Sequence, residues 1–219
     1  MRTTDVIKRL KTEYERLDYN FCEGDEFDLN LFGLRHPDYN NLFNDLLGCA
    51  YKSGGKWCLS LWRGTTDPGR YYLEQPMNSG GTAIVKAGQY RGVWQLGLHR
   101  GSYEALVQTG NAITIWRDAN KDDSFTFDES SLSTGYFGIN YHKSGTHSEL
   151  VDNWSAGCQV HGDQAGFEEA MHLARMQRLF HPTWTKYSYT LFTLMDEPGC
   201  EKSESLAFLF DIEPGWVKK

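Results

Sequence analysis

The residues of this sequence with the clearest chemistry are one cysteine and one histidine. Cys158 follows the small residues Ser155, Ala156 and Gly157, and His142 stands sixteen positions before it. A cysteine becomes a nucleophile when a base takes its proton, and histidine is a common base for this purpose. Small residues in front of the nucleophile let the backbone turn sharply and approach a substrate. We therefore predict that Cys158 is a nucleophile and that His142 activates it.

The elements around these two residues decide whether their side chains can meet. His142 ends the apolar segment 134–142, which we predict to be a strand, and Cys158 begins the next strand. Two adjacent strand ends would bring the imidazole and the thiol together. His147, in the polar loop that follows, is the alternative base. We prefer His142 because a hydrophobic strand anchors it.

The segment 155–158, Ser-Ala-Gly-Cys, together with the upstream His142, resembles the catalytic motif of the L,D-transpeptidase (YkuD-type) family. In that family a histidine and a loop precede a Ser-x-Gly-Cys sequence that leads into a strand. The segment 86–90, Lys-Ala-Gly-Gln-Tyr, resembles the family's upstream Pro-x-Gly-x-Tyr/Phe strand, with Ala87 where proline is usual. The resemblance covers roughly residues 80–195.

This resemblance implies a specific acyl transfer. The Cys158 thiolate would attack the carbonyl of a diaminopimelate-type residue in a stem peptide of peptidoglycan, and the terminal D-alanine would leave. An amine would then accept the acyl group to form a cross-link, or water would accept it in a carboxypeptidase or endopeptidase reaction. The resemblance also implies that Ser155 holds the catalytic loop, that the amides of Gly157 and Cys158 are oxyanion donors, and that no cofactor is required.

The motif also departs from the family pattern. That pattern has His-Gly before the cysteine and an arginine soon after it, whereas Ala156 precedes Gly157 here and Gln159-Val160 follows the cysteine. These differences indicate a divergent member, such as a carboxypeptidase or a phage-encoded lytic enzyme. The N-terminus is charged and lacks the apolar segment of a signal peptide. We therefore expect synthesis in the cytoplasm and action at the bacterial cell wall after delivery by a phage route.

Other polar and aromatic residues are candidates for substrate binding. Arg100 and Tyr103 follow a predicted strand, where Arg100 would bind a carboxylate and Tyr103 would stack on the substrate. Trp154 stands just before the catalytic loop and would form a wall of the cleft. His147 completes this set. An ordinary β-turn at Arg100 and a tryptophan packed beneath a loop are the alternative interpretations.

The acidic loop of residues 118–129 resembles a calcium-binding loop. Oxygen-bearing side chains stand at alternate positions, as an EF-hand-type site requires. The predicted ligands are Asp118, Asn120, Asp122, Ser124 and Glu129. Asp123 occupies the position at which glycine normally makes the sharp turn, and strands rather than helices are predicted on either side. The alternatives are a structural calcium ion and a solvated hairpin without metal.

The pattern of apolar residues predicts a mainly β fold with flanking helices, in the α+β class. Helices are predicted at 4–18, 38–50 and 167–180, the last with Asp163 as its N-cap. Strands are predicted at 27–35, 57–62, 82–90, 91–99, 103–109, 112–118, 134–142, 186–195 and 205–212. We expect an L,D-transpeptidase-like β-sandwich or barrel at 80–219, with residues 1–79 as an N-terminal helix and cap-like region packed on it.

Composition excludes several other classes. The 219 residues carry a net charge of −7 and include no long basic stretch. This composition argues against nucleic acid as the main partner. The sequence contains no apolar run of about 18 residues, so no membrane span is predicted. The five cysteines are odd in number and lack a Cys-x-x-Cys pair, so neither a disulfide framework nor a zinc site is indicated.

Two other functions compete with the peptidoglycan enzyme. A papain-like cysteine peptidase would place its cysteine before its histidine and at the start of a helix, whereas here His142 comes first and Cys158 begins a strand. The order therefore disfavours that class. A non-catalytic cell-wall-binding or structural module that retains the fold is the second alternative, and its thiol would be inert.

Overall fold

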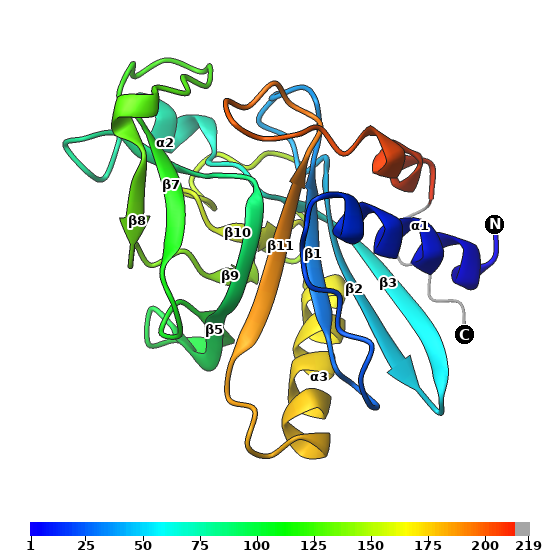
Figure 1. The fold of residues 1–219 in the computed structure, drawn as a ribbon. Coiled ribbons are helices and arrows are strands. Elements are labelled where there is room, and N and C mark those ends of the chain that lie inside the picture. Colours follow the sequence, from blue (N-terminus) through cyan, green and yellow to red (C-terminus); the bar gives the residue numbers. More distant parts are fainter. Residues whose placement is uncertain (213–219) are drawn as a thin grey trace.

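The computed structural model describes residues 1–212, which form two β-sheets with helices packed around them (Figure 1). The helices are α1 (Thr3–Arg16), α2 (Arg70–Glu74) and α3 (Gln164–Phe180), and the 3-10 helices are η1 (Glu129–Ser131) and η2 (Glu204–Asp211). The strands are β1 (Asn30–Arg35), β2 (Asp45–Ser53), β3 (Lys56–Thr65), β4 (Thr82–Val85), β5 (Gly88–His99), β6 (Tyr103–Val107), β7 (Ile113–Asp118), β8 (Ser133–Gly135), β9 (Tyr141–Lys143), β10 (Gln159–His161) and β11 (Tyr187–Thr193).

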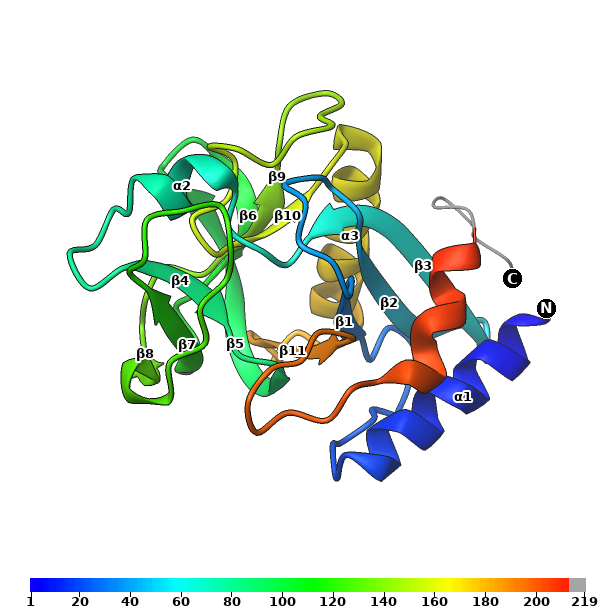
Figure 2. The ribbon, with the colours of Figure 1, turned by 90° about the horizontal axis from the view of Figure 1, so that it is seen from above.

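Most of the strands belong to one closed barrel, in the order β1-β11-β5-β6-β9-β10-β3-β2. The smaller sheet has the order β4-β7-β8 and lies at the end of the molecule away from α1 (Figures 1 and 2). Two pairs in the barrel are parallel, β1 with β11 and β9 with β10. The mainly β, α+β class predicted from the sequence is confirmed.

Strands β1 to β3 are buried along most of their length because both of their faces are covered. One face packs with α3 in a core that includes Leu31, Trp62 and Met171. The other face packs with α1 and η2 around Phe32 and Leu61. Figure 2 shows α1 and η2 side by side over this second face. A strand buried on both faces shows a continuous rather than an alternating apolar pattern.

Four predicted elements are wrong. The segment 82–90 was expected to be one strand, but it forms β4 of the smaller sheet and the start of β5 in the barrel. The segment 38–50 was expected to be helical, but its second half forms β2, which pairs with β1 and β3 on its two edges. The segment 205–212 was expected to be a strand, but η2 packs its apolar residues against α1 without strand pairing. The segment 134–142 was expected to be one strand, but it forms the end of β8 and the start of β9 with irregular backbone between them.

The region before residue 79 is part of the barrel. The cap-like role predicted for residues 1–79 does not describe β1, β2 and β3, because these strands pair with β11 and β10 and close the barrel. One apolar core also joins Leu31 of β1 with Trp94 of β5 and Tyr189 of β11. The helix α1 lies on the outside of the sheet and covers one of its faces. Within residues 1–212 no helix has the length and apolarity needed to cross a membrane.

Candidate active site

The parallel pair β9–β10 sets the relation between the two predicted catalytic residues. In its register Val160 lies beside His142, and Gln159 lies beside Tyr141. Successive side chains of a strand point to opposite faces, and Gln159 and Tyr141 point into the buried interior. Cys158 and His142 therefore share the outward face as diagonal neighbours. Within residues 1–212 no hydrogen bond joins the Cys158 sulfur to His142, so the thiol and the imidazole must still approach each other for proton transfer.

The Cys158 side chain is partly exposed and has polar contacts on both sides. The backbone N–H of Asn140 donates to its Sγ at 3.4 Å, and the carbonyl oxygen of Gly138 lies 3.5 Å from the sulfur. Burial raises the pKa of the Cys158 thiol, and the Asn140 N–H and the positive charge of Arg100 oppose that rise. The resting side chain is therefore a neutral thiol, and a base must take its proton during the reaction.

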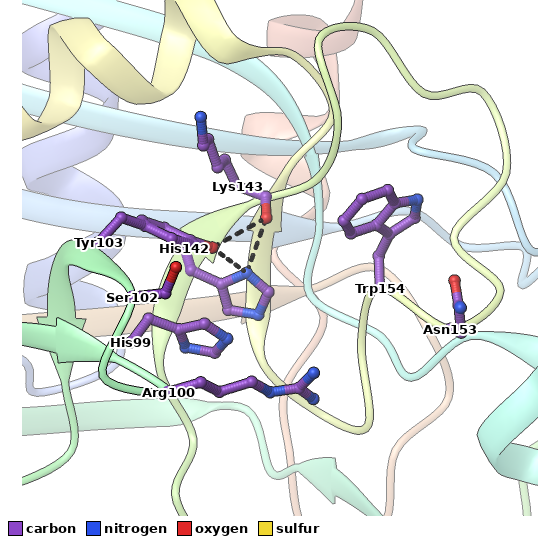
Figure 3. A pocket seen from close by; sticks show the side chains of 8 residues that line it. All are labelled: His99, Arg100, Ser102, Tyr103, His142, Lys143, Asn153 and Trp154. Atoms are coloured by element: carbon purple, nitrogen blue, oxygen red, sulfur yellow. Dashed lines mark hydrogen bonds between the residues drawn. The ribbon is translucent and has the colours of Figure 1, made fainter.

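One hydrogen bond fixes the tautomer of His142. Its Nδ1 lies 2.9 Å from the carbonyl oxygen of Lys143, which can only accept, so Nδ1 carries the proton (Figure 3). Nε2 of the neutral ring is then the acceptor, as a general base requires. Burial lowers the pKa of His142 to about 3, and the neighbouring His99 contributes to this change. His142 is neutral at physiological pH.

A second histidine, His99, which begins the segment 99–103 predicted to line the substrate cleft, stacks on the first. The rings of His99 and His142 lie 4.1 Å apart at an interplanar angle of 25° (Figure 3). The Asn140 side chain lies 3.1 Å from His99 Nδ1, and its Oδ1 accepts a hydrogen bond from the backbone of Gln108. The Asn140 NH₂ group therefore donates to His99 Nδ1. The ring proton of neutral His99 is then on Nε2.

The loop before the nucleophile is held by the predicted serine. Ser155 is fully buried, and its Oγ donates to the carbonyl oxygen of Cys158 at 2.8 Å and accepts from the Gly157 N–H at 3.1 Å. Gly157 has a φ of 115°, and a Cβ there would collide with the carbonyl oxygen of Ala83. The Gly157 amide is thus engaged within the loop. Among residues 1–212 the Cys158 amide has no hydrogen-bond acceptor, so it remains the candidate oxyanion donor.

A cavity of about 310 Å³ opens beside His142 (Figure 3). Its lining residues are His99, Arg100, Ser102, Tyr103, His142, Lys143, Asn153 and Trp154. The structure thus brings three of the four predicted substrate-binding residues together with the predicted base. The fourth, His147, is exposed and pairs with Asp163 at the start of α3, outside this lining.

The charge of the cavity differs from that of the whole chain. The protein carries a net charge of −7, yet no aspartate or glutamate lines the cavity, and Arg100 and Lys143 do. Neither cation forms an ion pair within residues 1–212. The Lys143 ammonium lies over the Tyr103 ring at 5.5 Å. The cavity therefore favours an anionic ligand.

Four of the five predicted calcium ligands make hydrogen bonds within their own loop. The Asp118 carboxylate accepts backbone N–H groups from Asn120 and Thr126, and Asp122 accepts from the backbone and side chain of Ser124. Glu129 belongs to η1 and is exposed. Within the described residues no group of three or more His, Cys, Asp or Glu side chains could hold a metal ion. Calcium binding stays a prediction, and the chemistry below does not use it.

Comparison of the chain with protein-family models, curated proteins and solved structures finds no match. The resemblance to L,D-transpeptidases therefore stays a prediction that rests on the residues of the site.

Proposed function

We propose that this protein is a cysteine-dependent acyl-transfer enzyme of the L,D-transpeptidase type, which acts on stem peptides of peptidoglycan at the bacterial cell wall. The observation that carries the proposal is the shared outward face of Cys158 and His142, with the base nitrogen of His142 fixed as an acceptor. The closed barrel that supports this pair is consistent with the finer fold predicted from the motif.

The first half of the reaction forms a thioester. His142 Nε2 takes the proton from Cys158 as the sulfur attacks the acyl carbonyl carbon, and the Cys158 amide stabilises the resulting oxyanion. The carbon–nitrogen bond to the terminal D-alanine then breaks. The proton on Nε2 passes to the departing amine, so the acyl group stays on the sulfur and the imidazole is neutral again.

The second half releases the acyl group. An amine or a water molecule gives a proton to His142 Nε2 and attacks the thioester carbon. The carbon–sulfur bond breaks, and Cys158 regains its proton. Because the departing and the attacking groups both exchange protons with Nε2, both occupy the cavity that His142 lines. Arg100 lines the same cavity and would bind the carboxylate of the terminal D-alanine.

The proposal is tested by incubating the protein with purified disaccharide tetrapeptides and analysing both the products and the intact protein by mass spectrometry. We expect loss of D-alanine and a mass increase on the protein that corresponds to the acyl group. Cys158→Ala should abolish both. His142→Ala should slow turnover by roughly 10²–10⁴-fold, as is typical of the loss of a general base.

A matched control separates the nucleophile from the other thiols. Cys22 is also partly exposed but lies in the segment before β1, and Cys22→Ala should retain full turnover. Circular dichroism should show that all variants fold. Full turnover by folded Cys158→Ala would refute the proposal.

The non-catalytic alternative needs a test that does not depend on alkylation. An activated cysteine usually shows a lowered pKa, whereas burial raises that of Cys158. Slow labelling by iodoacetamide at neutral pH is therefore expected for the enzyme and for an inert module alike. Acylation by a stem peptide distinguishes them, because only the enzyme forms the thioester.

A further inference from the structure

A second cavity borders the catalytic loop. It has a volume of about 230 Å³, below the roughly 300 Å³ at which pockets for drug-sized ligands begin. Its lining residues are Met77, Asn78, Gly81, Thr82, Ala83, Arg117, Phe137 and Ala156. A space of this size suits one residue of a peptide rather than a whole peptide.

The residues that the Cys158 sulfur contacts stand in the sequence between a residue of each cavity. Along the segment 137–142, Phe137 lines the second cavity and His142 lines the first. The sulfur contacts Gly138 and Asn140, which stand between them. The catalytic loop also borders both cavities, because Trp154 lines the first and Ala156 the second.

Arg117 gives the second cavity its charge. One of its side-chain N–H groups donates to the carbonyl oxygen of Gly81 at 3.0 Å, and its guanidinium lies 5.1 Å from the Phe137 ring centroid. Within residues 1–212 it has no ion pair, and no acidic residue lines the cavity. Burial lowers the pKa of Arg117, which reflects the cost of burying a cation without a counter-ion.

The direction of proton transfer assigns a role to each cavity. The leaving amine and the acceptor must reach His142 Nε2, so they occupy the first cavity. The acyl group that remains on the sulfur must then extend away from His142, toward Arg117. A guanidinium binds a carboxylate through two parallel N–H donors and does not bind a neutral carboxamide in that way.

We propose that the Arg117 cavity binds the acyl-donor residue of the substrate and selects donors that carry a free carboxylate on that residue. This inference rests on the proposed function and deepens it, because it makes Arg117 a specificity-determining residue for the acyl donor.

The test compares two stem tetrapeptides that differ only in a free carboxylate or a carboxamide on the acyl-donor residue. The value of kcat/KM is measured for each donor. The unchanged protein should prefer the carboxylate by at least about tenfold. Arg117→Gln should lower turnover of the carboxylate donor and leave that of the carboxamide donor nearly unchanged, so that the preference disappears. Arg117→Lys should retain part of the preference, because the charge remains while the two-pronged geometry is lost.

Arg91 supplies the matched control, since it is an exposed arginine of β5 without an ion pair in the described part of the chain. Arg91→Gln should keep the preference. Equal turnover of both donors by the unchanged protein, or an undiminished preference in Arg117→Gln, would overturn the inference while leaving the proposed function intact. Failure of both donors to acylate Cys158 would overturn the two together. If Arg117→Gln does not fold, the donor preference of Arg117→Lys is compared with that of the unchanged protein. An undiminished preference in Arg117→Lys would then overturn the inference.

Discussion

At the scale of single residues, the stack of His99 on His142 determines the kind of catalysis that this site can perform. Two imidazoles 4.1 Å apart cannot both be protonated without strong repulsion. Both histidines are also buried, which lowers both pKa values. The site therefore starts from a neutral imidazole and a neutral thiol. It is arranged for general-base catalysis rather than for a resting thiolate–imidazolium pair.

His99 is thus expected to be a positioning residue that keeps His142 unprotonated. In His99→Gln the neighbouring imidazole is absent and water can approach, so the pKa of His142 should rise toward its ordinary value of 6.5. Since the neutral ring is the base, the acid limb of kcat/KM should move to higher pH. At pH values below the pKa of His142, each unit by which that pKa rises should lower kcat/KM by about tenfold. The measurement is the pH dependence of stem-peptide turnover.

Leu98 is the control for this experiment because it is the exposed neighbour of His99 on the same strand. Leu98→Ala should leave the position of the acid limb unchanged. A purely structural role for His99 would lower the rate equally at every pH. An acid limb that stays in place in His99→Gln would contradict the prediction.

At the scale of elements, the spacing between the catalytic residues has a structural reason. Parallel strands require a crossover of a dozen or more residues, and residues 144–158 supply the connection between β9 and β10. The sequence could therefore indicate that the histidine and the cysteine stand at neighbouring strand ends. It could not give the register, because β9 and β10 are only three residues long and carry little pattern.

The elements that could not be predicted were decided by tertiary packing. Residues 205–212 are apolar enough for a strand, but no sheet edge takes them up, and they pack on α1 as η2. Residues 45–50 fit a helical spacing as well as a strand, and their pairing with β1 and β3 decides between the two. Arg117 was missed as a site residue because its cavity depends on contacts between the catalytic loop and β4.

The helix α3 was predicted from its cap and its apolar face, and that cap also pairs with the crossover between β9 and β10. The Asp163 carboxylate accepts from the Gly166 N–H at 2.8 Å, and Asp163 pairs through its backbone with His147 of the catalytic crossover. Asp163→Ala should lower the free energy of unfolding by about 1 kcal/mol, the usual value of an aspartate N-cap. Urea denaturation followed by circular dichroism measures this change.

His172 is exposed in the middle of the same helix. His172→Ala should change the free energy of unfolding by no more than about 0.5 kcal/mol, as is typical of exposed positions. Equal stability of Asp163→Ala and the unchanged protein would show that the cap contributes nothing.

At the scale of the whole molecule, one buried arginine joins the barrel to the smaller sheet. Arg35 of β1 donates to Asp67 at 2.7 Å and to Glu197 at 3.0 Å, and it also donates to the carbonyl oxygen of Val85 in β4. Glu197 in turn accepts from the Trp116 side chain in β7. Asp45 lies in the same buried group. One guanidinium therefore faces three buried carboxylates, an arrangement that favours retention of a proton.

The retained proton predicts how stability changes with pH. Burial and the neighbouring Asp45 raise the pKa of Asp67 from 3.8 to about 8. Between these two values the folded chain holds a proton that the unfolded chain has lost, so the free energy of unfolding falls as pH rises, by at most about 1.4 kcal/mol per pH unit. The stabilisation is complete below pH 3.8 and is lost above about pH 8.

Asp67→Asn should remove this dependence, because the amide cannot lose a proton while its Oδ1 can still accept from Arg35. The variant should therefore gain stability relative to the unchanged protein as pH rises from 4 to 8, and urea denaturation at several pH values measures the difference. Asp211→Asn, at an exposed position of η2, should follow the unchanged protein at every pH. A constant difference between Asp67→Asn and the unchanged protein would mean that Asp67 is ionised in the fold and that Arg35 balances the carboxylates around it without a proton.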